Sequence, residues 1–369
     1  MKMKKISFLF FLCSLLYLLK PLLIGYYADF SVHYDSANAL LERKNPYLEG
    51  GNFFIPDVYP PFSQFFFIPF TTMSTYSAGE LWVVLSIGFY LLSIILLMNV
   101  FSFRWDQKSL FLIGLINFTF FPLKFTLGMG QVNTLVLLFC CLFLYFVKRK
   151  SSYVYAGSAL AMSILWKLFP LFVLPYLLMK RKYSVLVVLF LTFAAVVLLS
   201  ILLFGIPIHI YFIREVLPSL LGGWKDYYYN QSIAFPIAVL FSENSPFRIV
   251  SYALLSLIFL IPAIFLSFKR PFSILALTTI FTATLLVNRF TWQHHLVLLL
   301  PSFFCVVALI PVWKSRIGFF VGLSYVLVAV NLSKPLGFPL LIQSHALIGM
   351  TLLYGIQLYL WYKVTNEEN

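Results

Sequence analysis

The chain has 369 residues, of which 62% are hydrophobic and 10% are charged, and its formal net charge at pH 7 is +14. Its mean hydropathy of +0.94 exceeds what a soluble domain of this length carries, so the composition excludes a water-soluble protein and predicts a bilayer protein. The sequence has no Walker-type loop, no H-E-x-x-H and no G-x-S-x-G, which excludes the common forms of ATP, zinc-protease and serine-hydrolase chemistry.

The first predicted element is a membrane span at the N-terminus. An apolar run of about 20 residues follows a lysine-rich start, and this is longer than the core of a signal peptide. No small-x-small cleavage site follows the run. We therefore expect a retained first span.

Charged residues divide the remaining chain into further apolar runs, several of them short. We predict an all-α membrane protein, a multi-spanning helical bundle of about twelve transmembrane helices that forms one integral-membrane catalytic domain over residues 1–369. The predicted spans are 6–27, 80–101, 109–123, 131–147, 152–166, 168–179, 183–204, 247–268, 271–287, 295–313, 317–331 and 341–362.

The distribution of lysine and arginine predicts the orientation. Short basic turns alternate along the chain with longer polar segments, and basic turns are retained on the cytoplasmic side. This places both termini in the cytoplasm and accounts for the net charge without a nucleic-acid partner. The segments left on the outer face are 28–79, 205–246, 288–294 and 332–340.

The first outer segment contains an amphipathic pattern. Val32, Ser36, Ala39 and Leu40 recur at helical spacing, which predicts a helix lying on the outer membrane surface after the first span. Asp29 stands just before this helix. It fits a carboxylate that accepts a proton or binds a hydroxyl, and it fits a helix cap equally well.

Several separated segments resemble the multi-spanning glycosyltransferases of family 87. They are "DFSVHYDSANALLERKNPY" at 29–47, "VYPPF" at 58–62, "GMGQVNTL" at 128–135, "LWKLFPLFVLPYLL" at 165–178, "YNQSI" at 229–233 and "TWQHHLVLLLP" at 291–301. Asp29 matches the family's acidic position. His33 replaces a usual tyrosine and Asp35 also departs from the pattern, so neither inherits a role.

The resemblance implies a GT-C-type fold and transfer of a sugar, mannose by default, from a polyprenyl-phosphate donor to a glycan or glycolipid acceptor. It implies an active site on the outer face and a bacterial plasma membrane as the location. Asp29 and Asp35 could hold a cation, but two carboxylates without a dense acidic cluster are a weak metal signal, so we expect no obligatory metal and no cofactor. In a single displacement the acceptor oxygen attacks the anomeric carbon as the lipid phosphate departs. One group must take the acceptor's proton, and cations or hydrogen-bond donors must stabilise the leaving phosphate.

For the base, the outer segments supply Asp29, His294 and His295. Trp292 offers an aromatic face on which a sugar ring could stack. His294 fits the family's Trp-x-His position better than His295. The alternative for this run is an interfacial aromatic belt with solvated histidines.

For the phosphate, Lys167 is the first candidate because it lies between two apolar runs, where a lysine needs an anionic partner or must snorkel. Arg289 and Lys124 are further candidates, with snorkelling as their alternative. Four amides, which could bind sugar hydroxyls or join helices, are Gln131, Asn133, Asn230 and Gln231.

Two other functions remain open at this stage. A flippase for lipid-linked sugars would also be basic inside with many spans, but it would carry its polar groups at mid-membrane. An O-antigen ligase or polymerase would share the outer face but would need a much larger outer loop with paired arginines. The four cysteines all lie in apolar runs and indicate no redox chemistry.

Overall fold

The computed structural model describes residues 2–48, 57–150, 152–222, 228–268, 273–310, 316–332 and 338–366. Within these ranges the chain is helical, and its only β-type pairing is an isolated bridge between Asn230 and Trp292. The prediction of an all-α protein is therefore confirmed. Parts of the predicted outer segments 28–79, 205–246 and 332–340 lie outside the described residues, as do the basic turns at 269–270 and 314.

The N-terminal half contains eleven of the helical elements, and their ends follow local sequence signals. Asp106 caps the sixth α-helix by accepting a hydrogen bond from the Ser109 amide. The elements are α1 (Lys2–Tyr17), α2 (Lys20–Ile24), α3 (Ala28–Leu41), α4 (Pro61–Gln64), η1 (Phe65–Thr72), α5 (Thr75–Val100), α6 (Gln107–Thr119), α7 (Phe121–Met129), α8 (Asn133–Lys148), α9 (Tyr153–Trp166) and η2 (Phe169–Phe172).

The second half continues the helical pattern. Its elements are α10 (Val173–Met179), α11 (Tyr183–Phe204), α12 (Ile206–Tyr211), η3 (Phe212–Val216), α13 (Leu217–Gly222), α14 (Ala234–Leu240), α15 (Pro246–Phe268), α16 (Ile274–Val287), η4 (Gln293–Leu299), α17 (Leu300–Leu309), α18 (Arg316–Ala329), α19 (Leu340–Gln343) and α20 (His345–Asn366).

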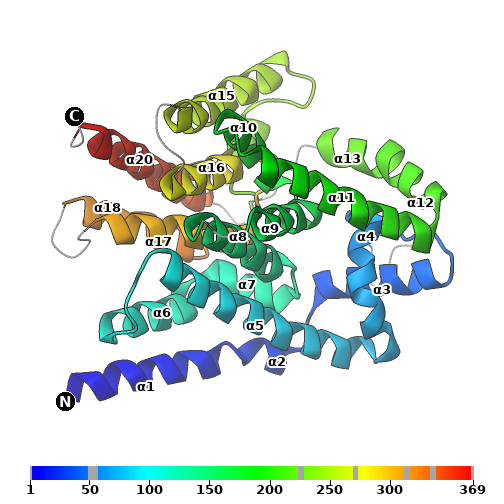
Figure 1. Cartoon of the computed structure of the whole chain (residues 1–369), viewed down its shortest axis with the longest axis horizontal. Helices are drawn as coiled ribbons and strands as arrows, with labels where there is room; N and C mark the ends of the chain where they lie inside the picture. Colours follow the sequence, from blue (N-terminus) through cyan, green and yellow to red (C-terminus); the bar gives the residue numbers. More distant parts are fainter. Residues whose placement is uncertain are drawn as a thin grey trace.

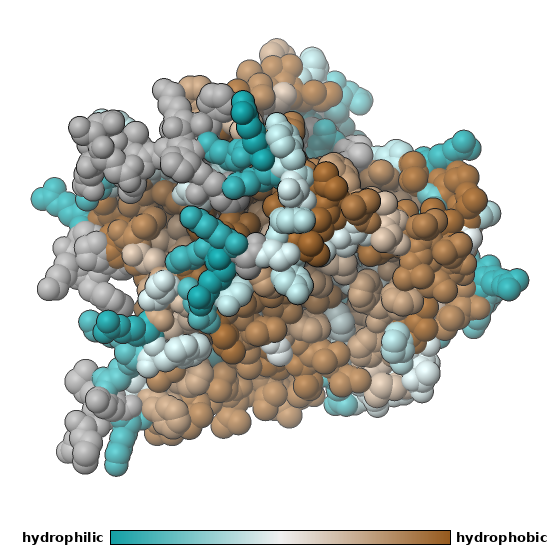
Figure 2. Space-filling view, viewed as in Figure 1, coloured by the Kyte–Doolittle hydropathy of each residue, from teal (hydrophilic) through white to brown (hydrophobic). Residues whose placement is uncertain are grey.

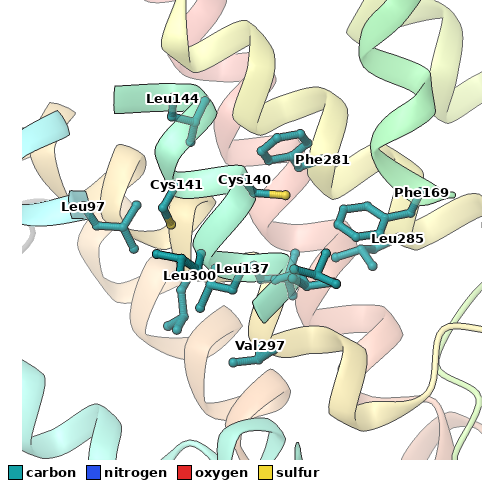
Figure 3. Close-up of a cluster of buried hydrophobic side chains, with 14 of the residues drawn as sticks. Leu97, Leu137, Cys140, Cys141, Leu144, Phe169, Phe281, Leu285, Val297 and Leu300 are labelled. Atoms are coloured by element: carbon teal, nitrogen blue, oxygen red, sulfur yellow. The ribbon is translucent and has the colours of Figure 1, made fainter. Parts of the chain in front are cut away.

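The centre of the fold is α8, which packs between α5 and α9 (Figure 1). Next to α9 lies α11, and α16 packs against α15 and α20. On the edge of the molecule away from α15, α1 runs along α6. Figure 3 shows part of the hydrophobic core, with Cys140 of α8 beside Phe281 of α16.

By length and composition, fewer helices qualify as membrane spans than the twelve predicted. Among the residues that the structure describes, four helices are long and apolar enough to cross a membrane, namely residues 5–24, α5, α11 and residues 246–265. The bent pair α6 and α7 makes a fifth if it is one span. A helix exists in each of the twelve predicted places, but several are too short for a hydrocarbon core of about 30 Å, so the count of twelve is not confirmed.

The surface supports a bilayer location. Large apolar side chains are exposed along α11 and α15, including Leu202 at 74% and Phe247 at 67%, which only a lipid environment or a partner would tolerate. Figure 2 shows a surface that is apolar over most of the face in view, with the hydrophilic residues gathered in separate groups. The chain is a membrane protein.

The predicted amphipathic surface helix corresponds to α3, but its setting differs. This helix begins at Ala28, so Asp29 lies in its first turn and the residue before the helix is Tyr27. It packs against η1, α4, α5 and α7, and Phe30, His33 and Ala37 are fully buried. The position of α3 on the outer membrane surface is not confirmed.

Candidate active site

The site begins with a contact between two distant segments. The side-chain amide of Gln131 donates a hydrogen bond of 2.7 Å to Asp29 Oδ2. Gly130 makes this possible, because it ends α7 with a φ of +68° and a Cβ there would lie 2.6 Å from the Cβ of Phe30. The carbonyl of Gly130 also accepts a 2.8 Å hydrogen bond from the Trp82 indole. Gln131 is thus fixed beside α3.

Tyr59 joins this pair to a cation. Its hydroxyl donates to Gln131 Oε1 over 3.3 Å, and Lys167 Nζ lies 6.0 Å from the centre of its ring. Tyr59 is held from behind, because its amide donates to Asp57 Oδ1 and its carbonyl accepts from the Tyr47 hydroxyl, both over 2.8 Å. The backbone of Tyr59 is therefore held in place, and its side chain contacts both the Gln131 amide and the Lys167 ammonium.

Lys167 follows the last residue of α9, where the chain becomes extended before a proline-containing turn. Its Nζ lies 2.7 Å from Nε2 of His295. The His295 ring also hydrogen-bonds the Phe290 carbonyl, while Nδ1 lies 3.3 Å from the Trp292 amide. The Trp292 amide donates to Nδ1, and Nε2 is the ring nitrogen next to the Lys167 side chain.

The charges of Asp29 and Lys167 influence each other without forming an ion pair. Burial raises the pKa of Asp29, and the Gln131 hydrogen bond and the Lys167 charge only partly oppose this. Burial lowers the pKa of Lys167 to about 7, against the attraction of Asp29. Within the described ranges the single ion pair is Lys44 with Glu42, so Asp29 and Lys167 influence each other's charge from beyond ion-pair distance.

The two adjacent histidines have different surroundings. The carbonyl of His294 accepts hydrogen bonds from Thr126 at 2.9 Å and from the Asn133 side chain at 3.1 Å. Its ring is buried and packs on Phe125 and, parallel, on Trp292. His295 is the histidine that contacts Lys167. The geometry therefore favours His295 for the site, although the sequence pattern favours His294.

Three of the four predicted amides are engaged with the main chain. The amide of Asn133 holds the His294 carbonyl, as described above. Asn230 donates to the Arg289 carbonyl over 2.7 Å and accepts from the Thr291 amide, while Gln231 donates to the carbonyls of Tyr228 and Gln343. These hydrogen bonds hold the loop that carries Trp292 in place. Gln131 is the amide that reaches a candidate catalytic residue.

Arg289 and Lys124 are the other two predicted phosphate ligands. None of their described contacts is with Lys167. The Arg289 guanidinium stacks over the Tyr252 ring at 5.3 Å, and Lys124 Nζ lies 5.1 Å from the centre of the Tyr17 ring. Of the predicted outer segment 205–246, residues 223–227 lie outside the described ranges.

A buried polar network behind Tyr59 was not predicted. The Gln64 side chain hydrogen-bonds both the Asp57 carboxylate and Nδ1 of His33. The centre of the His33 ring lies 4.4 Å from that of Tyr59 and 4.3 Å from that of Phe67. Burial raises the pKa of Asp57 to about 7 and lowers that of His33 to about 3. The one sequence signal was the Tyr-Pro-Pro segment, which by itself indicates only a turn.

One comparison with known proteins gives a match. The model of glycosyltransferase family 87 matches residues 58–288, which is more than half of the chain. The matched segment includes Tyr59, Gln131 and Lys167, whereas Asp29 and His295 lie outside it. Searches of curated proteins and of solved structures find no match.

Proposed function

The chain belongs to glycosyltransferase family 87 and is a membrane glycosyltransferase; from this premise we propose that it transfers a hexose from a polyprenyl-phosphate donor to an acceptor hydroxyl on the outer face of the membrane. Mannose is the proposed sugar, with an α-linked product, because that is the family's default. No cofactor or metal takes part in the proposal.

The observation that carries the proposal is the arrangement of Asp29 and Lys167 around Tyr59. Gln131 hydrogen-bonds both the Asp29 carboxylate and the Tyr59 hydroxyl, while the Lys167 ammonium contacts His295 and lies 6.0 Å from the centre of the Tyr59 ring. The reaction needs a proton acceptor and a phosphate-binding cation at a separation that leaves room for a sugar. The electrostatic contact without an ion pair fits that requirement.

In the proposed step, the acceptor oxygen forms a bond to the anomeric carbon and its proton passes to Asp29. The bond from the anomeric carbon to the phosphate oxygen breaks, and its electron pair leaves with the lipid phosphate. The Lys167 ammonium stabilises the developing negative charge, and His295 orients that ammonium. Tyr59 and Gln131 hold the carboxylate in place.

The test is sugar transfer by the purified protein in lipid vesicles. We expect radiolabel from polyprenyl-phosphate mannose to enter a new glycoside when an acceptor extract is supplied. Label that crosses the vesicle membrane without forming a glycosidic bond would support a flippase instead. A donor panel with glucose and galactose, run in parallel, tests the choice of sugar.

A further inference from the structure

A groove of about 720 Å³ lies where the first helix breaks, away from the site described above. Its walls come from α1 and α2 on one side and Phe118 of α6 on the other. The lining is almost wholly apolar and includes Leu16 and Leu23, whose side chains are 69% and 88% exposed. Such a groove suits a hydrocarbon chain.

Two ammonium groups lie beside this groove. Lys20 lines it, and both Lys20 Nζ and Lys124 Nζ lie within 6 Å of the centre of the Tyr17 ring, at 5.8 Å and 5.1 Å. Neither lysine is within ion-pair distance of a carboxylate in the described part of the chain. The positive charge beside the groove is therefore not neutralised within that part of the protein.

We infer that this groove binds an anionic phospholipid of the surrounding bilayer, with one acyl chain along α1 and the phosphate between Lys20 and Lys124. The apolar walls select a lipid over a soluble anion, and the two lysines select an anionic headgroup over a zwitterionic one. Only 17% of the apolar window of this span is buried in the protein, so bilayer lipid has direct access. The inference needs a membrane-embedded chain but not sugar transfer.

Cys13 supplies a reporter inside the groove. It lines the groove one helical turn before Tyr17, and it is exposed, whereas Cys140, Cys141 and Cys305 are buried. A bound acyl chain would cover its thiol. The rate of modification by N-ethylmaleimide, followed by mass spectrometry of the protein in detergent micelles, therefore measures occupancy.

We expect phosphatidylglycerol to slow this modification on the order of tenfold more than phosphatidylcholine at the same ratio to detergent. The double variant Lys20→Gln with Lys124→Gln should lose the difference. Lys5→Gln with Lys108→Gln removes the same charge from exposed lysines elsewhere and should retain it. Lys20→Arg with Lys124→Arg should also retain it, which separates loss of charge from misfolding.

Four results would overturn the inference. Equal protection by both lipids would show that the groove does not select the headgroup. A preference for phosphatidylglycerol that survives the double glutamine variant would show that the two lysines do not bind the headgroup. Protection by polyprenyl phosphate at a far lower ratio than phosphatidylglycerol would make the donor-type lipid the occupant. Inorganic phosphate should give no protection, because it has no chain to cover Cys13, and protection by it would contradict a lipid site.

Discussion

Lys167 Nζ lies 2.7 Å from His295 Nε2, although 128 positions separate these residues in the sequence. The lysine ends a helix in the middle of the chain, and the histidine lies in the short helix η4. His295 is a neutral partner, so it orients the Lys167 ammonium without cancelling its positive charge. That charge is therefore available to a ligand. This suits a leaving phosphate, and it leads to the first prediction.

Lys167→Ala should weaken donor binding by about 10- to 100-fold, the usual value of a hydrogen bond to a charged group. His295→Ala should have a smaller effect on binding, because it removes the orienting partner and leaves the charge. Donor affinity is measured by equilibrium binding of labelled lipid. Lys108→Ala, which changes an exposed lysine, is the control. Normal donor affinity in a well-folded Lys167→Ala protein would exclude Lys167 as the phosphate ligand.

Tyr59→Phe should lower turnover about fivefold, because it removes one neutral hydrogen bond to Gln131 and keeps the ring against Lys167. Gln131→Leu should cost more, since it also removes the contact with Asp29. Combining the two changes should add little to Gln131→Leu alone, because both act through one chain of hydrogen bonds. Tyr155→Phe, at an exposed tyrosine of α9, is the control. Full additivity would show that Tyr59 acts independently of Gln131.

In the pH profile of kcat/KM, the fall in activity on the alkaline side should begin at an unusually low pH. The step needs Asp29 deprotonated and Lys167 protonated, so a raised Asp29 pKa moves the acid limb upward from the usual carboxyl range. The Lys167 pKa of about 7 moves the alkaline limb of kcat/KM far below that of an ordinary lysine. Bound donor phosphate favours the ammonium and should shift the alkaline limb of kcat to higher pH. Full kcat/KM retained up to pH 10 would rule out this role for Lys167.

The proposed orientation can be tested with single cysteines in a Cys13→Ser background. Val58 and Arg149 are both exposed, and the proposal puts Val58 on the outer face and Arg149 in the cytoplasm. In intact cells an impermeant thiol reagent should modify Val58→Cys and leave Arg149→Cys unmodified. Permeabilised cells supply the control, in which both should react. Modification of Arg149→Cys in intact cells would reverse the assignment.

Hydropathy placed a helix in every expected position, because apolar runs and their breaks are local properties. It could not count spans, because α8 and α9 are as apolar as a true span but too short to cross alone. The predicted break between 152–166 and 168–179 does coincide with the turn at Lys167, but the pattern could not show whether helices as short as these cross the membrane.

The site was predictable in part. Asp29, Lys167 and Gln131 were all selected, yet the contacts that join Asp29 to Gln131, and Lys167 to His295, bring together segments far apart in the chain and belong to the tertiary fold. The amides Gln131 and Asn230 look alike in sequence, but only the first reaches a candidate catalytic group in the described contacts.

The central claim is that Asp29 takes the proton of the acceptor, and single-turnover transfer in Asp29→Asn tests it most directly. The asparagine keeps the size of the side chain and can accept the hydrogen bond from Gln131, but it lacks the basic oxygen. The protein is loaded with labelled donor and mixed with excess acceptor, and product is followed over time. We predict donor binding close to that of the wild type and product formation slower by about 10² to 10⁴-fold. Product formation at the wild-type rate, with donor bound, would contradict the account.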